Sequence, residues 1–443
     1  MRKFNGFTEL TGYLESARSG APVFLFGSEG LPAVMTGDVF AAEVRKRAAE
    51  LSGNSYTCEA IVCDGTPACV TEIFAANIAG KQVVLLDPSA EDRFGILLPY
   101  TDADCIYQGG TLTAAPGAGV SEGEDRILFF TSGTTAANKA VVLTGASLMA
   151  SAYNGSVMFP LGTEDNLLCL LPLSHVFGFV CGLLWGLTCG ACVSLGRGMR
   201  HYIDDCAYFR PTAVSLVPLL LGFMLQYRTF NPELKTVLIG GGDCKRELLD
   251  AVTASGRRLA FGYGLTETSS GVAISTGGDP YAMDICPEPR ITLADDGEIL
   301  IEAPTCMMQG YYKHEDETAA VLKDGILYTG DLGSFDDDGR LHITGRKKEM
   351  LVLSSGTKIF LPEAEAELAR LLGTEELALA LAGDRVTLFL YAPEMDEGTV
   401  QEKSRPFNDA RDRARQIGAV RFLKEKLPRT ATGKIKRYLI SKE

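Results

Sequence analysis

The stretch that decides the fold reads Ile127-Leu-Phe-Phe-Thr-Ser-Gly-Thr-Thr-Ala-Ala-Asn-Lys-Ala-Val-Val-Leu143. It predicts two apolar strands, at 127–130 and 141–143, joined by a tight turn that pivots on Gly133. Such a turn points several backbone N–H groups in one direction, which suits a phosphate group. Hydroxyls and one lysine surround the same turn: Thr131, Ser132, Thr134, Thr135 and Lys139. A solvated Ser/Thr hairpin is the alternative, and no Walker A pattern is present to decide between them.

Size and charge restrict the class of protein. A chain of 443 residues, with 46% hydrophobic and 22% charged residues, is typical of a globular protein with two or more domains. The net charge of −14 argues against broad nucleic-acid binding. From Arg411 to the end, however, eleven Lys or Arg face three Asp or Glu. This basic tail predicts a part that meets phosphates or an acidic partner, or else a solvated helix face.

The cysteines and one apolar segment raise two further questions. Twelve cysteines are scattered without the density of a disulfide scaffold, so we expect reduced thiols and a cytoplasmic protein. Cys189 and Cys192 have Cys-x-x-Cys spacing but lack the further ligands of a zinc site. The N-terminus has no apolar core of a signal peptide. Segment 167–195 carries no Asp, Glu, Lys or Arg but contains Pro172 and His175, so we expect a buried helix and strand pair and no membrane span.

Strand and helix patterns alternate through most of the chain. Early strands are expected at 23–26, 60–63 and 83–86, with helices at 38–51 and 67–79, the latter ending at Gly80. This rhythm predicts α/β layers with a largely parallel sheet. Later elements are a helix capped at Thr144 and strands at 168–171, 213–216, 236–239 and 259–261. Small-residue loops follow several of these strands, where ligands collect in open α/β sheets.

The sequence pattern changes near Ile291. Short β elements with turns predict a small antiparallel or barrel-like module there. Beyond residue 345 a further β and α run follows, with helices expected at 362–372 and 409–416.

Five motifs occur in one order along the chain, and two shorter ones support them. They are 131–139, Tyr263-Gly-Leu-Thr-Glu267, Tyr328-Thr-Gly-Asp331, Gly345-Arg-Lys-Lys348 and Pro428-Arg-Thr-Ala-Thr-Gly-Lys434, supported by Gly310-Tyr-Tyr312 and Pro172-Leu-Ser-His175. With them the chain resembles the adenylate-forming (AMP-binding) superfamily, which contains acyl- and aryl-CoA synthetases, adenylation domains and luciferases. The resemblance implies a large N-terminal domain of layered α/β sheets with a β-barrel-like subdomain, residues 1–345. A small, mobile α+β lid domain would follow, residues 346–443.

The resemblance also implies a reaction in which a carboxylate attacks the α-phosphorus of ATP and releases pyrophosphate. Because two anions must meet, the site needs positive charge and hydrogen-bond donors. Nucleotide contacts are implied for Thr131, Ser132, Gly133, Thr134, Thr135 and Lys139 (β- and γ-phosphates), Tyr263, Gly241, Gly242 and Asp243 (adenine), Asp331 (ribose) and Arg346 (ribose and phosphate).

Four residues would carry the chemistry. By resemblance, Thr266 is a donor to the α-phosphate and Glu267 is the Mg²⁺ ligand. Lys434 would bridge the substrate carboxylate and the α-phosphate region. His175 would lie between the acyl pocket and the thioester step, or is a core histidine. The lid would swing about Lys348 between a pose that presents Lys434 and one that opens a path beside 354–356 for a pantetheine thiol.

The sequence departs from the family in the phosphate loop. Ala136, Asn138 and Ala140 stand where members usually have Gly, Pro and Gly. A methyl group at 136 restricts positive φ values, so the loop conformation and the strength of phosphate binding are expected to differ from those of other members.

The expected substrate is an apolar carboxylic acid, fatty or aryl. Val176 follows His175 at the position where amino-acid-activating members have Asp, and the apolar segments 214–224 and 268–274 would line the pocket. The acceptor would be CoA, or alternatively the phosphopantetheine arm of an acyl carrier protein. A nucleotide-binding member without ligase activity is a rival interpretation that Glu267 and Lys434 oppose, and a luciferase-like oxidative role is a third.

Overall fold

The computed structural model describes residues 1–119, 125–131, 139–354, 357–383, 385–428, 435 and 440. Its largest sheet consists, in spatial order, of β15 (Asp284–Ile285), β14 (Ser270–Ser275), β13 (Arg258–Leu265), β12 (Thr236–Ile239), β11 (Ala213–Leu216), β9 (Asn166–Cys169), β10 (Cys192–Leu195), β1 (Pro22–Phe26) and β2 (Ala33–Thr36). Neighbours from β13 to β1 pair in parallel, and the strands at both edges are antiparallel. The predicted α/β sheet is therefore confirmed.

A second sheet carries the stretch 127–143. Its spatial order is β18 (Gly310–Tyr311), β8 (Ala140–Leu143), β7 (Ile127–Phe130), β4 (Gln82–Leu86), β3 (Cys58–Val62), β5 (Cys105–Gln108) and β6 (Thr111–Ala114). Strands β7, β4, β3 and β5 are parallel, and β7 and β8 form an antiparallel hairpin. The two predicted strands of the stretch are thus neighbours at one side of this sheet.

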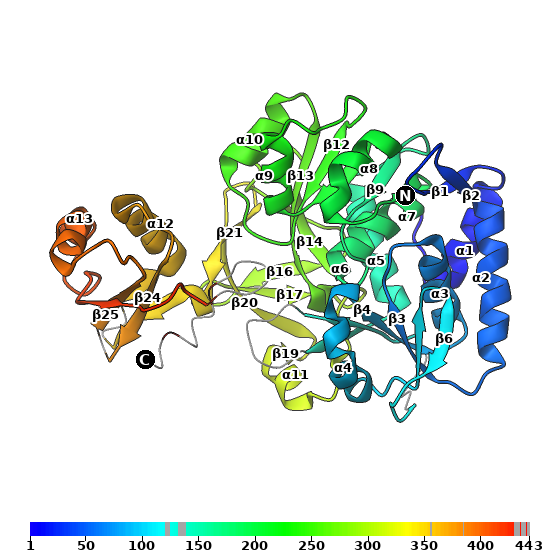
Figure 1. The fold of residues 1–443 in the computed structure, drawn as a ribbon, viewed down its shortest axis with the longest axis horizontal. Helices are drawn as coiled ribbons and strands as arrows, with labels where there is room; N and C mark the ends of the chain where they lie inside the picture. The colour runs from blue at the N-terminus through cyan, green and yellow to red at the C-terminus, as the bar shows by residue number, and fades with distance from the viewer. Residues whose placement is uncertain are drawn as a thin grey trace.

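Helices cover both sheets. Figure 1 shows α9 (Pro218–Gln226) and α10 (Arg246–Ala254), in green, beside β12 and β13 of the largest sheet. At the other end, α1 (Phe7–Ala17) and α2 (Gly37–Ser52), in blue, lie next to β1 and β2 (Figure 1). Further helices are α3 (Pro67–Ile78), α4 (Phe94–Tyr100), α5 (Gly145–Met158) and α8 (Tyr202–Phe209).

An aromatic cluster joins the two large sheets. Phe129 of β7 packs against Phe179 of α6 (Val176–Phe179), with ring centroids 5.6 Å apart. Phe7 of α1 contacts Phe179 at 6.3 Å and Phe74 of α3 at 4.4 Å. All four rings are buried, and such pairs add about 0.5–1.5 kcal/mol each beyond area burial. The cluster fixes the β7–β8 hairpin relative to the helix that begins after His175.

Two predicted helix ends are confirmed. The Thr144 hydroxyl accepts from the Ser147 N–H at 2.9 Å, and the Ser147 hydroxyl accepts from the Thr144 N–H at 3.0 Å. This reciprocal capping box satisfies two N–H groups that the helix cannot satisfy itself. Gly80 follows α3 with a φ of +75°, a value that glycine adopts without strain.

The apolar segment 167–195 is folded into the protein. It contains most of β9, then α6, a π-helical turn (Val180–Leu184), α7 (Trp185–Cys189) and β10, with largely buried side chains. Across the described part of the chain, no helix has both the length and the apolar character needed to cross a bilayer.

The module after residue 290 is an open antiparallel sheet. Its order is β16 (Arg290–Leu293), β17 (Glu298–Glu302), β20 (Ile326–Phe335) and β19 (Leu322–Lys323), and β21 (Leu341–Arg346) also pairs with β20. Closure into a barrel would require the edge strands to pair with each other, and no such pairing occurs among the described residues. The antiparallel alternative is the one that forms.

The elements after residue 349 have a hydrophobic core of their own. They are β22 (Met350–Val352), β23 (Lys358–Phe360), α12 (Leu361–Leu372), β24 (Leu377–Ala382), β25 (Arg385–Leu390), α13 (Glu397–Asp409) and β26 (Ala419–Phe422). Leu361, Leu368, Leu388 and Phe407 contribute to this core. Figure 1 shows α12, α13, β24 and β25 to one side of the two large sheets.

The prediction of a helix at 409–416 is wrong, because the helix that forms is α13, which lies earlier in the chain. Asp396 caps α13 by accepting from the Thr399 N–H at 2.7 Å, and α13 ends at Asp409. Side-chain amides then hold the following backbone in turns. The Gln416 side chain donates to the Asn408 and Arg411 carbonyls, and the Asn408 side chain accepts from the Ile417 N–H. These local bonds compete with helix formation.

A pair of carboxyl groups is buried under α2 and α3. Glu59 of β3 and Glu72 of α3 have 1% and 2% of their surfaces exposed. Arg47 donates from Nε and Nη2 to the two oxygens of Glu72, both at 2.7 Å. Burial, followed by the hydrogen bond and charge of Glu72, raises the pKa of Glu59 to about 10. Glu59 is therefore a neutral acid at physiological pH.

This burial predicts a loss of stability at alkaline pH. The neutral Glu59 side chain contributes to the free energy of unfolding, and this contribution is fully present below the ordinary carboxyl pKa of 4.5. It is lost as pH rises toward 10, by up to about 1.4 kcal/mol per pH unit. Glu59→Gln stays neutral, so its melting temperature should fall less than that of the wild type between pH 6 and pH 9. Calorimetry at both pH values measures this. Exposed Glu394→Gln is the control and should keep the wild-type slope. An unchanged slope in Glu59→Gln would contradict the assignment.

Candidate active site

The Asp331 carboxylate joins the largest sheet to the antiparallel sheet. Asp331 lies on β20, opposite Arg346 of β21, and is 2% exposed. The Tyr263 hydroxyl, on β13, donates to Oδ2 at 2.8 Å, and Arg346 Nε lies 2.8 Å from Oδ1. Burial and the adjacent carboxylate raise the pKa of Tyr263, so its phenol stays protonated and donates. Tyr263, Asp331 and Arg346, expected to contact one nucleoside, are therefore in direct contact.

A second carboxylate stands just beyond the end of β13. Glu267 lies in a 3₁₀ turn (Thr266–Thr268), and its backbone carbonyl accepts from the Met308 N–H at 2.8 Å. The Tyr311 hydroxyl donates to Glu267 Oε1 at 2.7 Å. Burial, together with the Glu267 carboxylate, raises the pKa of Tyr311. Tyr311 therefore holds one oxygen of the expected metal ligand.

Lys139 lies on the other side of Tyr311. Its ammonium group is 4.9 Å from the centre of the Tyr311 ring and forms an ion pair with Glu317 of α11 (Glu315–Val321). The Thr131 N–H donates to the Lys139 carbonyl at 3.0 Å, so these two residues close the base of the β7–β8 hairpin.

Most of the predicted phosphate loop lies outside the described residues: Ser132, Gly133, Thr134, Thr135 and the departures Ala136 and Asn138. The third departure, Ala140, is fully buried in β8 opposite Phe130. A strand residue does not need the conformational freedom of glycine, so alanine is tolerated there.

The glycine loop after β12 needs its glycines for two reasons. A Cβ atom on Gly240 would come within 2.9 Å of the Phe177 ring, and Gly241 has a φ of +77°. Gly242 and Asp243 follow and are exposed. The Tyr281 hydroxyl donates to the Cys244 carbonyl at 2.6 Å and ties the end of the loop to the edge of the largest sheet.

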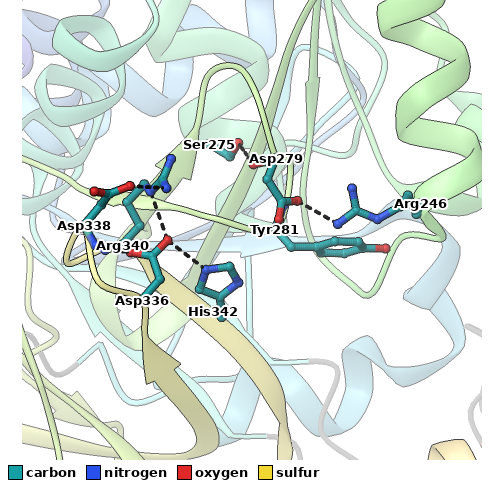
Figure 2. Close-up of polar contacts among 8 residues, drawn as sticks. All are labelled: Arg246, Ser275, Asp279, Tyr281, Asp336, Asp338, Arg340 and His342. Atoms are coloured by element: carbon teal, nitrogen blue, oxygen red, sulfur yellow. Dashed lines mark hydrogen bonds and ion pairs between the residues drawn. The ribbon is translucent and has the colours of Figure 1, made fainter.

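Figure 2 shows two groups of polar contacts beyond this loop, one around Asp279 and one around Asp336. Arg246, the first residue of α10, donates to Asp279 at 2.7 Å and lies 4.7 Å from the Tyr281 ring centre. Across from it, His342 of β21 contacts Asp336 at 3.2 Å. Backbone hydrogen bonds between 283 and 341 join the two halves. The glycine loop and the strands that carry Asp331 and Arg346 are thus connected.

His175 caps α6 at the junction of the two large sheets. Its Nε2 is 3.8 Å from Oδ2 of Asp87, which follows β4, and 49% of its side chain is exposed. Partial burial lowers the pKa of His175, and the Asp87 carboxylate opposes this effect. The imidazole is therefore neutral at pH 7 and accessible, which the alternative of a core histidine does not fit.

The segments that follow His175 pack against β14, and we refer to α6, the π-helical turn and β14 together as the wall. The Ser215 hydroxyl donates to the Cys181 carbonyl at 2.7 Å and satisfies a backbone group within the π-helical turn. Cys181 Sγ lies 3.5 Å from the Ser270 hydroxyl, and Ser270 has a φ of +113°. A non-glycine residue in this conformation is strained, a feature that concentrates at functional sites. Behind this wall the core is filled by buried Trp185, Leu238, Ala260 and Ile274.

Apart from His175 and the glycine loop, the predicted site residues fall into three groups. Contacts link Thr131, Lys139, Tyr263, Glu267, Asp331 and Arg346 into two clusters at the ends of β7 and β13. Thr266 begins the Glu267 turn, where its carbonyl accepts from the Ser269 N–H. Lys434 lies outside the described residues. Sequence reasoning missed the role of Tyr311, although the Gly310-Tyr-Tyr312 motif marked its position, and it missed Asp87 and Glu317, for which no motif gave a signal.

Comparisons with known proteins show the family of the chain. The sequence model of the AMP-binding enzyme family matches residues 54–312, more than half of the chain. The chain therefore belongs to the AMP-binding enzyme family. A 2-succinylbenzoate–CoA ligase of Listeria monocytogenes is 27% identical over 382 residues, which cover 82% of this chain and 78% of that protein. Another 2-succinylbenzoate–CoA ligase, of Bacillus cytotoxicus, is 29% identical over 262 residues. This match covers 55% of this chain and 54% of that protein, so it spans about half of the relative.

The fold is also that of solved structures. An o-succinylbenzoate CoA synthetase of Bacillus subtilis, in complex with its acyl-adenylate intermediate, superposes with a TM-score of 0.78. The alignment covers 99% of this chain and 98% of that structure at 19% identity. At this identity the match shows the fold.

The surroundings of His175 predict its titration. We expect its imidazole to titrate below the ordinary value of 6.5. Because Asp87 favours the protonated form, Asp87→Asn should lower the pKa further, by less than about one pH unit for a half-exposed pair. Histidine NMR resonances followed against pH, with His175→Gln for assignment, measure both values. Asp92→Asn, which alters an exposed residue five positions beyond Asp87, should leave the resonance unchanged. A pKa above 6.5, or a rise in Asp87→Asn, would refute this description.

Proposed function

We propose that this protein activates a carboxylic acid with ATP and transfers the acyl group to CoA. A carboxylate oxygen attacks the α-phosphorus, the bond from that phosphorus to the bridging oxygen breaks, and pyrophosphate leaves. The CoA thiol then attacks the acyl carbon, loses its proton, and AMP leaves. The observation that carries the proposal is the direct contact of Tyr263, Asp331 and Arg346 beside the Glu267–Tyr311–Lys139 cluster.

The nucleoside would lie between the glycine loop and β20. Gly241 and Gly242 let the backbone approach adenine, with Asp243 at the edge and the Tyr263 ring against the base. The Asp331 oxygens, already in place between Tyr263 and Arg346, would accept from the two ribose hydroxyls. Because Asp331 is fixed by both neighbours, little ordering is required when nucleotide binds.

The phosphates would lie toward the β7–β8 hairpin. Thr131, Lys139 and the loop 132–135 supply donors, and Thr266 would donate to the α-phosphate. Among the described residues no group of three or more His, Cys, Asp or Glu could hold a metal by itself. Glu267 nevertheless fits Mg²⁺, which is commonly bound by one carboxylate plus substrate phosphates. Mg²⁺ would neutralise phosphate charge there; Glu267 would hold it, and the Tyr311 hydroxyl bonds to one Glu267 oxygen.

The C-terminal part would act as the lid. The separate core of residues 353–407 supports the proposed division at 345/346. Lys348 would be the hinge, and Lys434 would bridge the two reacting groups as charge develops. The second pose would open the path beside 354–356 to the CoA thiol. Twelve unpaired cysteines support a reducing compartment, so we place the protein in the cytoplasm.

Among acids, we propose an aryl substrate in preference to a long fatty acid. The two relatives described above are 2-succinylbenzoate–CoA ligases, which act on an aryl acid. The side chains of Phe177, Cys181 and Ser270 suit contact with a flat ring, and the filled core behind them favours a compact acid over an extended chain. His175 would lie between this acyl site and the thioester step.

An ATP–pyrophosphate exchange assay over a panel of aryl and fatty acids tests the activity. We expect exchange with aryl acids and thioester formation with CoA. Lys434→Ala should reduce exchange by about 10²–10³-fold, because a group at the developing charge is removed. Lys436→Ala, in the same basic tail, is the control. No exchange with any acid would support nucleotide binding alone, and transfer only to a carrier protein would overturn the proposed acceptor. Intact exchange in Lys434→Ala would refute its role.

Nucleotide binding provides a separate test. Asp331→Asn keeps the size of the side chain but loses the charge that pairs with Arg346 and one acceptor for ribose. We expect AMP affinity to fall by about tenfold or more, the loss typical of a charged hydrogen bond. Calorimetric titration measures it. Asp295→Asn, in the exposed turn between β16 and β17 of the same antiparallel sheet, removes a carboxylate outside this contact and should leave AMP affinity unchanged. Equal affinities in the two variants would exclude Asp331 from the nucleotide site.

A further inference from the structure

We propose that Tyr311 is a positioning residue that couples the metal ligand Glu267 to the phosphate-binding Lys139. The inference rests on the proposed function and adds a residue whose two ends act on two different groups. The hydroxyl holds the Glu267 carboxylate, and the ring face holds the Lys139 ammonium group. One side chain thereby sets the separation between the carboxylate and the cation that would both face the phosphates of ATP.

The hydroxyl end acts on one oxygen of Glu267. Its hydrogen bond to Oε1 is 2.7 Å long, and both side chains are partly buried. This bond fixes the rotation of the carboxylate and leaves Oε2 as the oxygen to be offered to a cation. A ligand whose orientation is held by an outer hydrogen bond binds metal more tightly than a free one.

The ring end acts on Lys139. The ammonium group stands 4.9 Å from the ring centre, within the range of a cation–π contact. Glu317 pairs with the same ammonium group from the side of α11. Lys139, with 25% of its side chain exposed, is thus held between a ring and a carboxylate and does not extend freely into solvent.

The backbone places Tyr311 independently of its side chain. Strand β18 pairs with β8, with Tyr311 opposite Val141 and Gly310 opposite Val142, two and three residues beyond Lys139. The Tyr311 N–H donates to the Thr318 hydroxyl at 2.9 Å, and the Met308 N–H donates to the Glu267 carbonyl. The segment 308–311 therefore bridges the Glu267 turn and the Lys139 strand, and the tyrosine lies at the crossing.

Binding of a non-hydrolysable ATP analogue, measured by calorimetry with Mg²⁺ and with EDTA, tests the hydroxyl. Tyr311→Phe keeps the ring over Lys139 and loses the bond to Glu267. We expect its affinity to fall about tenfold with Mg²⁺ present, since hydrogen bonds to charged groups are strong, and to change less than about twofold in EDTA. In exchange kinetics the KM for ATP should rise while the KM for the acid stays constant.

The adjacent tyrosine is a matched control. The buried Tyr312 hydroxyl also donates to a carboxylate, Asp102, at 2.6 Å, but away from the site. Tyr312→Phe should lower the melting temperature and leave the gain in affinity from Mg²⁺ at its wild-type value. An equal loss with and without Mg²⁺ in Tyr311→Phe, or the same Mg²⁺ dependence in both tyrosine variants, would overturn the proposal.

A double-mutant cycle gives a second measurement. If Tyr311 acts through Glu267, Tyr311→Phe should cost little further affinity in a Glu267→Gln background. Fully additive losses would overturn the coupling. A wild-type protein that binds the analogue but exchanges with no acid would instead refute the proposed function and leave the Tyr311 result to stand on the binding data.

Discussion

The site depends on one buried carboxylate placed where two sheets meet. Asp331 is nearly inaccessible to water, and burying a charge without partners is very costly. Tyr263 from β13 and Arg346 from β21 supply those partners. Since neither donor can move without exposing the charge, β13, β20 and β21 must keep their relative positions. The glycine loop, which follows β12 beside β13, then has a fixed location relative to Asp331.

The pairing of opposite charges also explains how Lys139 and Arg346 are held in position in an acidic protein. Lys139 and Arg346 would both face phosphates, yet each already pairs with a carboxylate, Glu317 or Asp331. These pairs hold the long side chains in one place, which reduces the entropy that a ligand must remove on binding. Asp331 stays buried, whereas Glu317 is 39% exposed and would be free to turn toward solvent if phosphates replaced it at Lys139. In the proposed site the charge pairing would therefore stay fixed at the ribose end and would exchange at the phosphate end.

Local signals in the sequence predicted the strands and caps well. The strands at 127–130 and 141–143 and the cap at Thr144 depend on neighbouring residues, and the structure has them within one residue. The helix expected at 409–416 failed because the Asn408 and Gln416 side chains bond to the backbone, which a periodic pattern does not reveal. Tyr311 and Asp87 were missed for another reason. Their partners lie far away in sequence, so only the folded chain shows that a motif tyrosine serves both Glu267 and Lys139.

Choice of acid depends on side chains that the fold leaves variable. A common fold at 19% identity does not determine which acid is accepted, and the proposed acyl site would lie between α6, the π-helical turn and β14. Here Phe177 reaches that wall only because Gly240 lacks a Cβ atom, and the strained Ser270 places its hydroxyl against Cys181. Strain of this kind persists only where the surrounding packing enforces it. The filled core behind Cys181 provides that packing, so the feature that holds Ser270 in place would also limit the depth of the proposed acyl site.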